Sequence, residues 1–352
     1  MRLLLSSVFL LTSTLAMATI DQRIDKLEAQ MQELRTETVY KNYGAHAASA
    51  YPSLQGYGGF FSIEGLYMKF FEGGTDYAFQ DTTSFASTNF VGTLKYLDFD
   101  WRFAFRVTAG YQFDSPDWDL WAEYMRFQTK QKRTSKLPDG GSLYNNEVLS
   151  ALSTQVLSSI KMNINFNIVD LNLGRPYFLR KTFSVHPFVG ARGAWIHQNQ
   201  TVIVDSVAVS LLKIKQHNDY NGVGLRSGSQ FRWHFDPHWS FFGSLAGSLM
   251  WGEFDNSRVE YATAASDQIK DFNLNLDTRR ILPNMSADAG LTWEQSFRCD
   301  KHRVRLTLGY EFDYWWRQNQ TIHLDANSAT TYYRFAEDLG LHGIKLNAAL
   351  DF

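Results

Sequence analysis

The most regular stretch of the chain runs from Asp98 to Asp114, where apolar and polar positions alternate without a break. Its odd positions are apolar or aromatic, and its even positions are polar, charged or small. A period of two indicates a β-strand with two unlike faces. Soluble strands usually hold about 5–6 residues, whereas a strand tilted across a bilayer needs roughly 9–11. The pattern therefore predicts a transmembrane strand with one face toward lipid and the other toward water.

Nine further segments repeat this alternation, and the connections between them differ in length. The segments are 60–71, 118–124, 161–173, 184–197, 222–235, 239–251, 285–297, 304–316 and 344–352. Short connections at 114–117, about 174–183, 236–238 and 299–302 alternate with long ones at about 72–97, 130–160, 198–220, 255–281 and 317–340. Short turns alternating with long loops are typical of outer-membrane barrels, with the turns in the periplasm.

The fold class predicted from this pattern is all-β, a transmembrane antiparallel β-barrel of about ten strands. Twelve strands is the alternative, if residues 77–90 or 148–160 hold a further pair. A secreted soluble β-protein is disfavoured, because such proteins rarely insert long loops repeatedly. Tryptophans near the strand ends are expected to form interfacial girdles. They are Trp101, Trp118, Trp195, Trp233, Trp239, Trp251, Trp293 and Trp316.

Two irregularities in the pattern predict β-bulges. In segment 161–173 the apolar parity changes after Ile168, as an inserted residue would produce. The motif WIHQNQT at 195–201 also recurs as WWRQNQT at 315–321, where strands are expected to leave the membrane. Because the parity of the two leading tryptophans differs, one copy needs a bulge.

The residues before the barrel carry separate signals. Residues 1–18 read as a secretory signal peptide, with Arg2 before an apolar run and a small-x-small cleavage site. Residues 19–40 predict a short periplasmic coiled-coil helix that either trimerises the protein or frays as a tether. Residues 41–56 read as a linker, and the barrel is expected over 57–352. The coiled-coil seam consists of Ile20, Ile24, Leu27, Met31 and Leu34.

Composition narrows the class. The net charge of -2 gives no general attraction to nucleic acid, so no nucleic-acid partner is expected. Mean hydropathy is -0.30, and after the N-terminus no run approaches the roughly 18 apolar residues of a membrane helix. Alternating strands average to neutral hydropathy, so a barrel stays compatible with these values. The single cysteine, Cys299, excludes an intramolecular disulfide.

Several segments resemble a known family. The sequences IVDLNLGRPYFL (168–179), VHPFVGARGAWIHQ (185–198) and WDLWAEYMRF (118–127) are similar to those of the Legionella-type pore-forming major outer-membrane proteins. That family is similar in character to the chlamydial major porins. The resemblance implies an outer-membrane barrel that conducts small solutes and is often oligomeric, with no catalytic residues to transfer. Chlamydial porins are cysteine-rich, so the lone Cys299 argues against a disulfide-linked network here.

Charged positions on the polar faces are the candidate functional residues. In a water-filled lumen they would tune ion preference, whereas in a narrow lumen they would neutralise one another and plug it. A ten-strand barrel falls between filled eight-strand barrels and open porins of 16–18 strands. The predicted function is passive diffusion of ions and small hydrophilic solutes. The predicted pore-lining residues are Arg102, Arg106, Arg192, Arg226, Arg232, Asp288, Glu294, Arg303, Arg305, Glu311, Asp313 and Lys345.

A second hypothesis is a surface adhesion or recognition barrel that contacts host molecules through its external loops. The histidines are scattered, and no HExxH, GxSxG or metal-ligand spacing occurs, so we expect no enzyme, cofactor or metal. The expected partners are outer-membrane lipid, ions and small solutes, further copies of the chain in a trimer, and host surface molecules. The expected location is the outer membrane of a Gram-negative bacterium.

Overall fold

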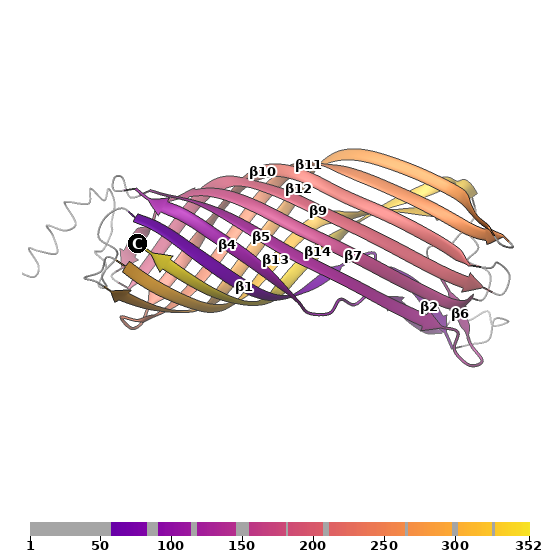
Figure 1. Cartoon of the computed structure of the whole chain (residues 1–352), viewed down its shortest axis with the longest axis horizontal. Coiled ribbons are helices and arrows are strands. Elements are labelled where there is room, and N and C mark those ends of the chain that lie inside the picture. The colour runs from indigo at the N-terminus through magenta and orange to yellow at the C-terminus, as the bar shows by residue number, and fades with distance from the viewer. Residues whose placement is uncertain are drawn as a thin grey trace, which may run out of the picture.

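Ten antiparallel strands form a closed barrel in the computed structural model (Figure 1). They are β1 (Gly58–Glu72), β4 (Arg102–Gln112), β5 (Asp119–Lys136), β7 (Gln155–Gly174), β9 (Phe183–Ser206), β10 (Leu212–His234), β11 (Trp239–Ala264), β12 (Asp267–Phe297), β13 (His302–Asp325) and β14 (Ser328–Asp351). Each strand pairs with its neighbour in sequence order, and β1 pairs with β14 to close the ring. The prediction of an antiparallel barrel with ten strands is confirmed.

The structure describes residues 58–82, 91–113, 118–145, 155–180, 182–206, 211–264, 267–297, 302–325 and 328–352. The expected signal peptide, coiled-coil helix with its seam, and linker lie outside these ranges. Across the ranges described, no helix combines the length and apolar character needed to span a bilayer.

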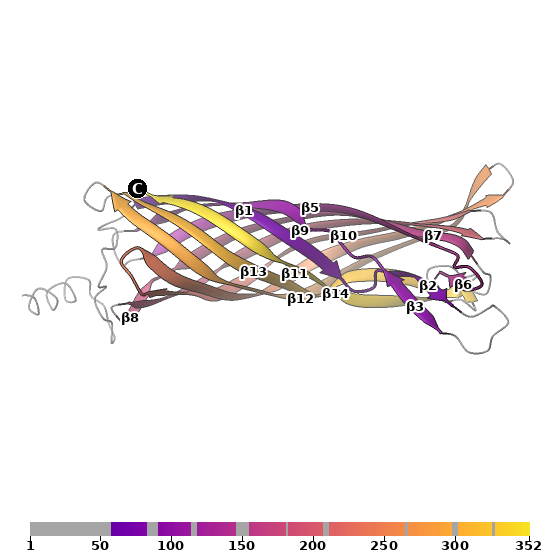
Figure 2. The same cartoon turned by 90° about the horizontal axis from the view of Figure 1, so that it is seen from below.

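Three short strands form a separate sheet at the end of the barrel away from the C-terminus (Figure 2). They are β2 (Asp76–Asp81), β3 (Gly92–Tyr96) and β6 (Ser142–Tyr144), in the order β3-β2-β6. We call them the small sheet. A fourth short strand, β8 (Tyr177–Arg180), pairs only with β9 at the other end. Of the two regions that could have extended the barrel to twelve strands, 77–90 contributes β2 to the small sheet, and the described part of 148–160 belongs to barrel strand β7.

The expectation of five long external loops is wrong for three of them. Most of 198–220, 255–281 and 317–340 is strand, because β9 to β14 continue nearly to the tips of their hairpins. These segments were expected to be loops because their sequences are mostly polar. A strand outside a membrane needs no apolar outer face, because its backbone pairs with its neighbours and its outward side chains face water.

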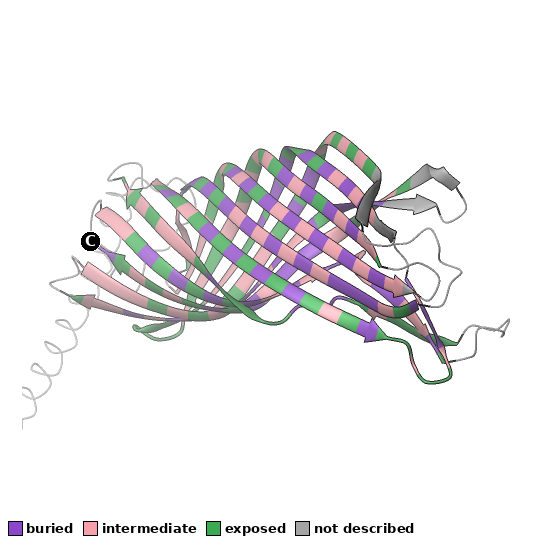
Figure 3. Cartoon of the chain, turned by 45° about the vertical axis from the view of Figure 1, so that its right-hand side comes forward, coloured by how far each residue is buried: buried purple, intermediate pink, exposed green. Residues whose placement is uncertain are grey.

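The apolar face of the strands changes sides along their length, as β7 illustrates. In its half nearer the C-terminal end of the barrel, Val169 and Leu171 are exposed on the outside, while Asp170 is buried inside. In the other half, Ile164 and Phe166 are buried inside. The predicted bulge after Ile168 is wrong, because pairing with β5 and β9 continues there without a shift. Figure 3 displays the alternation of buried and exposed positions on the strands.

Exposed tryptophans border the region whose outer surface is apolar. Trp195, Trp251 and Trp316 are exposed on the parts of β9, β11 and β13 away from the short turns, whereas Trp233 and Trp239 flank the short turn between β10 and β11. These positions suit the two interfacial girdles of a membrane barrel. Short turns of such barrels face the periplasm, so the small sheet faces outside the cell.

The barrel continues well beyond the outer girdle. From Trp195, β9 runs on to Ser206, which is roughly 36 Å of strand at about 3.3 Å per residue. We call the parts of the strands beyond this girdle the outer extension. Its strands carry polar residues on the outside, so it stands in water above the membrane.

The predicted bulge in the second WxxQNQT motif is confirmed. The register between β13 and β14 shifts between Trp315 and Asn319, and Arg317 adopts a left-handed φ of 56°. The bulge lets Trp315 point into the barrel, where it is fully buried, while Trp316 faces outward. The first copy, on β9, keeps a regular register with Trp195 outside.

Candidate functional site

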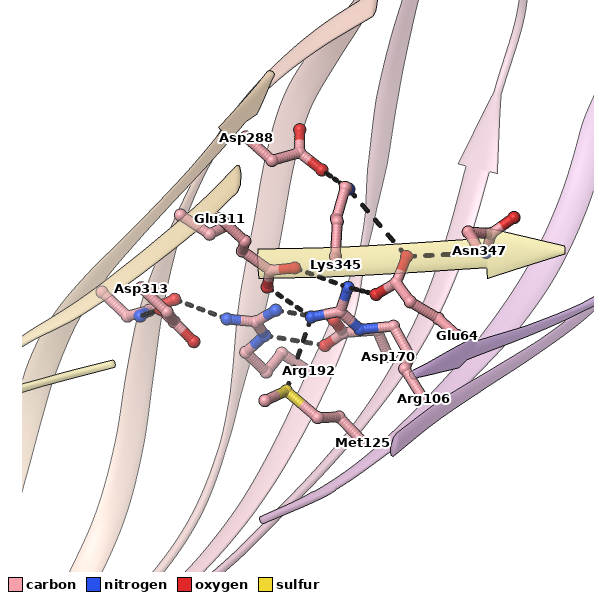
Figure 4. Close-up of polar contacts among 12 residues, drawn as sticks. Glu64, Arg106, Met125, Asp170, Arg192, Asp288, Glu311, Asp313, Lys345 and Asn347 are labelled. Carbon is pink, nitrogen blue, oxygen red and sulfur yellow. Dashed lines mark hydrogen bonds and ion pairs between the residues drawn. The ribbon is translucent and has the colours of Figure 1, made fainter. Parts of the chain in front are cut away.

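A layer of paired charges crosses the barrel interior at the level of the outer apolar surface (Figure 4). Eight of the ten barrel strands contribute to it, with four basic and five acidic side chains. We call it the ionic layer. Its members are Glu64, Arg106, Asp170, Arg192, Arg226, Asp288, Glu311, Asp313 and Lys345.

Arg106 of β4 joins two carboxylates from different parts of the chain. Its Nη1 lies 2.5 Å from Glu64 Oε1 on β1 and 2.9 Å from Glu311 Oε2 on β13, and its Nη2 pairs with the other Glu311 oxygen. Lys345 of β14 pairs with Asp288 and lies 4.0 Å from Glu64. Since β1 and β14 separate β4 from β13 in the barrel, the Arg106–Glu311 contact joins non-neighbouring strands across part of the interior.

Arg192 of β9 makes the second junction. Its Nε and Nη2 donate to both oxygens of Asp170 at 2.7 and 2.6 Å, a bidentate arrangement. Its Nη1 donates to Asn284 Oδ1 at 2.5 Å, and Asn284 Nδ2 donates to Asp313 Oδ1 at 2.5 Å. Arg226 adds a longer contact of 3.7 Å to Asp170. The carboxylates of this junction are thus held by cations or amides.

A second group of charges lies inside the barrel near its periplasmic end. Asp351 accepts from Arg303 at 2.8 Å and from Arg305 at 2.7 Å. Glu294 pairs with His234 at 2.9 Å and lies 3.5 Å from Arg232. These basic side chains are partly exposed, so this end of the interior is wetter than the ionic layer.

Eleven of the twelve predicted pore-lining residues face the interior, in the ionic layer or near the periplasmic end. That they line a conducting path stays a prediction. Arg102 is the exception. It is exposed on the outer surface, where its Nη2 donates to the backbone oxygen of Lys130 at 3.4 Å. Parity failed here because the pairing of β4 with β5 ends at Ala104, so the Arg102 side chain is free to reach outward over β5.

Sequence reasoning missed Asp170 as a site residue. It lies between Val169 and Leu171, in the segment where the apolar parity changes. A carboxylate between two apolar residues of a membrane strand was the available signal, because such a side chain must point away from lipid and requires a partner.

An apolar core fills the barrel interior on the extracellular side of the ionic layer. It includes the fully buried Phe70, Phe127, Phe166, Phe254 and Trp315 from the barrel wall. The small sheet and its flanking residues add further buried side chains, which are Tyr77, Ala78, Leu97, Phe99 and Leu143. Dense apolar packing of this kind excludes water.

A buried polar network lies within this core, two to three residues beyond Trp195 and Trp316, and therefore in the outer extension. Gln198 Nε2 donates to Glu72 Oε1 at 2.5 Å and to Gln318 Oε1 at 3.1 Å. Burial raises the pKa of the Glu72 carboxyl to about 8, although the Gln198 hydrogen bond opposes the shift. Glu72 is therefore mainly protonated at neutral pH.

Two cavities, of about 580 and 540 Å³, lie outside the ionic layer, and none of its residues lines them. Among the side chains that the structure describes, no group of three or more His, Cys, Asp or Glu is placed to hold a metal ion.

Comparison with known proteins places the fold in context. The family model described as Legionella pneumophila major outer membrane protein precursor matches residues 58–352. No curated protein matches the chain.

Solved structures of outer-membrane barrels are also similar. The outer membrane protease OmpT from Escherichia coli is 11% identical over 89% of this chain and 99% of that chain, with a TM-score of 0.41. The CymD monoaromatic hydrocarbon channel is 8% identical, with coverages of 84% and 88% and a TM-score of 0.32. A Pseudomonas aeruginosa FadL homologue is 7% identical, with coverages of 84% and 90% and a TM-score of 0.25.

The expectation that the chain is not an enzyme is contradicted by the first of these likenesses, since that structure is a protease. An absence of familiar sequence motifs does not exclude catalysis by a barrel whose reacting groups come from several strands. At 11% identity and a TM-score of 0.41, the likeness gives this chain no activity.

Proposed function

The chain belongs to the Legionella major outer membrane protein family, and from this premise we propose that it acts at the cell surface as a recognition barrel. In this proposal the outer extension and the small sheet are the working surface, and host surface molecules are the partners. The membrane-level part of the barrel is the anchor.

The main observation behind this proposal is that side chains fill the interior of the barrel. The ionic layer joins non-neighbouring strands across the interior, and the apolar core lies on its extracellular side with fully buried aromatic side chains. An ion that crossed this core would have to displace closely packed side chains and lose most of its hydration, which is strongly unfavourable. A barrel filled in this way is suited to holding a rigid outer surface.

The small sheet supports the proposal further. One of its two edge strands in the order β3-β2-β6 is β3, and Leu94 and Tyr96 on that strand are 46% and 62% exposed. Exposed apolar side chains on a sheet edge are typical of protein interaction sites. An added strand from a partner would pair with the free edge and contact these side chains.

The test is adhesion of Escherichia coli cells that display the full chain to cultured animal cells. We expect adhesion above that of cells without the chain, and a reduction of severalfold in the Leu94→Ser, Tyr96→Ser variant. Leu120→Ser, on the membrane-facing surface, is the matched control and should leave adhesion unchanged. Equal adhesion by cells with and without the chain would contradict the proposal.

Passive diffusion of ions and small hydrophilic solutes is the second candidate, and the observation that favours it is the hydrophilic lining at membrane level. The charges of the ionic layer form a transverse row of the type that tunes ion passage. In this reading the small sheet has to leave the barrel mouth before conduction begins.

Recording from the purified, heat-modifiable protein in a planar bilayer separates the two functions. The recognition barrel predicts no step-like conductance from the full chain. Steps whose ion preference changes in Arg106→Ser would instead favour diffusion through the lumen. Steps that appear only after replacement of residues 76–98 by a glycine-serine linker would identify the small sheet as a gate.

A further inference from the structure

We propose that the outward face of β4, β5 and β7, just beyond the outer girdle, binds the phosphate groups of a phosphorylated, acylated glycolipid of the outer leaflet. This site lies on the outside of the barrel and does not depend on whether the interior conducts.

The first observation is a surface cavity of about 580 Å³ at this level. Its lining is entirely polar apart from Ile164, and it combines the cations Arg102 and Lys130 with side-chain amides. The lining residues are Arg102, Gln128, Thr129, Lys130, Asn163, Ile164, Asn165, His197 and Asn199. The cavity is large enough for a phosphorylated sugar headgroup.

The second observation is the sign of the charge around the cavity. The cations Arg102, Arg126, Lys130, Lys132 and Lys161 lie there, and none of them forms an ion pair with another described residue. Lys132 and Lys161 are directly paired in register across β5 and β7. Like charges directly opposite each other destabilise a sheet, so a bound anion would relieve their repulsion.

The amides present donors to the same space. Asn165 Oδ1 accepts from Gln128 Nε2 and from Asn167 Nδ2, both at 3.2 Å. With its oxygen engaged twice, the Asn165 side chain offers its N–H groups outward. Phosphate oxygens accept such hydrogen bonds alongside those from lysine and arginine.

The third observation is the position of the cavity relative to the membrane, which favours a lipid as the source of the phosphate. Immediately below the cations, Phe103 is 82% exposed, and Phe105 and Val169 are 43% and 40% exposed on the same outer surface. A ligand with acyl chains along these residues would hold its headgroup at the level of Lys130. Basic side chains at this level attract anionic lipid headgroups.

The strands beside this face carry acidic residues at the height of the cavity, although Lys215 of β10 lies level with Lys161. On β10 and β11 the outward positions at comparable height include Asp219, Glu253 and Asp255, and His197 already pairs with Asp219 at 3.2 Å. The cations nearest the cavity therefore lie on β4, β5 and β7, which gives a bound lipid a defined place.

The experiment measures lipid binding to the detergent-purified full chain by native mass spectrometry, with bis-phosphorylated lipid A as the probe. We expect at least roughly tenfold weaker binding for dephosphorylated lipid A, and a comparable loss for bis-phosphorylated lipid A in the Lys130→Gln, Lys132→Gln variant. The matched control is Lys213→Gln, Lys215→Gln, which removes the same charge from β10 and should bind normally. Heat-modifiable migration on gels establishes that each variant is folded.

Two results would overturn the proposal. Equal binding of phosphorylated and dephosphorylated lipid A would show that the phosphate groups are not recognised. Equal losses of lipid binding in the two double-lysine variants would show that binding depends on net charge and not on this site. Displacement of the lipid by millimolar inorganic phosphate would identify a free-anion site, whereas resistance to it supports a lipid headgroup.

Discussion

At the scale of single residues, the interior is governed by which charges have partners. Arg106 holds Glu64 and Glu311 together, and each of these side chains is largely removed from water. Removal of one partner from a buried ion pair costs more than the pair contributes, because the remaining charge stays buried. Stability should therefore depend more on the balance of the ionic layer than on its size.

Arg106→Ser tests this balance. It should lower the free energy of unfolding by about 3–5 kcal/mol, since Glu64 and Glu311 are left facing each other. The Arg106→Ser, Glu311→Gln variant should recover part of the loss. Urea unfolding in lipid vesicles, followed by tryptophan fluorescence, measures both values. A double variant no more stable than the single one would argue against repulsion as the cause.

Glu72 predicts a pH dependence of stability. Its pKa is about 8 in the folded protein, against an ordinary value of 4.5. Between these values the folded state holds a proton that the unfolded state has lost. The stability from this group is thus complete below pH 4.5 and falls as pH rises toward 8, by about 1.4 kcal/mol per pH unit. Unfolding of Glu72→Gln, measured from pH 5 to 8, should show a weaker decline than unfolding of the unaltered chain.

At the scale of the element, strand β7 explains what the sequence could and could not predict. Ten strands were predictable because each crosses the bilayer with a period of two, which a single sequence displays directly. Their continuation beyond the girdle was not, because segments such as 198–206 of β9 are mostly polar, as a loop would also be. The change of parity at Ile168 was visible, but it marks a change of the apolar face, where a bulge was expected.

The candidate site was likewise predictable only in part. Parity placed Arg106, Glu311 and Lys345 inside, because the membrane forces charge inward. It could not assign partners, since Arg106 and Glu311 are 205 residues apart. It failed at Arg102, which lies beyond the end of the pairing between β4 and β5.

A pair of substitutions on β7 measures the change of apolar face. Phe166→Ala, in the apolar core of the outer extension, should cost about 3–5 kcal/mol through the cavity it leaves. Leu171→Ala, half exposed toward lipid, should cost clearly less because lipid fills the space. Urea midpoints in vesicles compare the two. Equal costs would contradict the assignment of the two faces.

At the scale of the whole molecule, one set of strands passes through two environments, the membrane and the water outside it. Its periplasmic half has a polar interior and an apolar outside. Its outer half has a mainly polar outside and an interior that combines a packed apolar core with buried polar groups. The outer half therefore resembles a soluble β-barrel that stands on a membrane anchor.

Labelling of intact cells checks this orientation. With Cys299 replaced by Ser, a Thr201→Cys variant should react with a membrane-impermeant maleimide, because Thr201 lies beyond Trp195 in the outer extension. Val189→Cys, 60% exposed on the membrane-level surface, should be protected by lipid. The reverse pattern would place the small sheet in the periplasm.

The cations on the outer extension also constrain biogenesis. To reach the far side, Arg126, Lys130, Lys132 and Lys161 must traverse the hydrocarbon, where a lysine or arginine facing lipid costs about 2–4 kcal/mol at the midplane. If the outer extension were already folded, these charges would make its insertion through the bilayer very slow. Its hairpins have to be translocated while the ring is still open, and the aromatic interior condenses only afterwards, on the exterior side of the envelope.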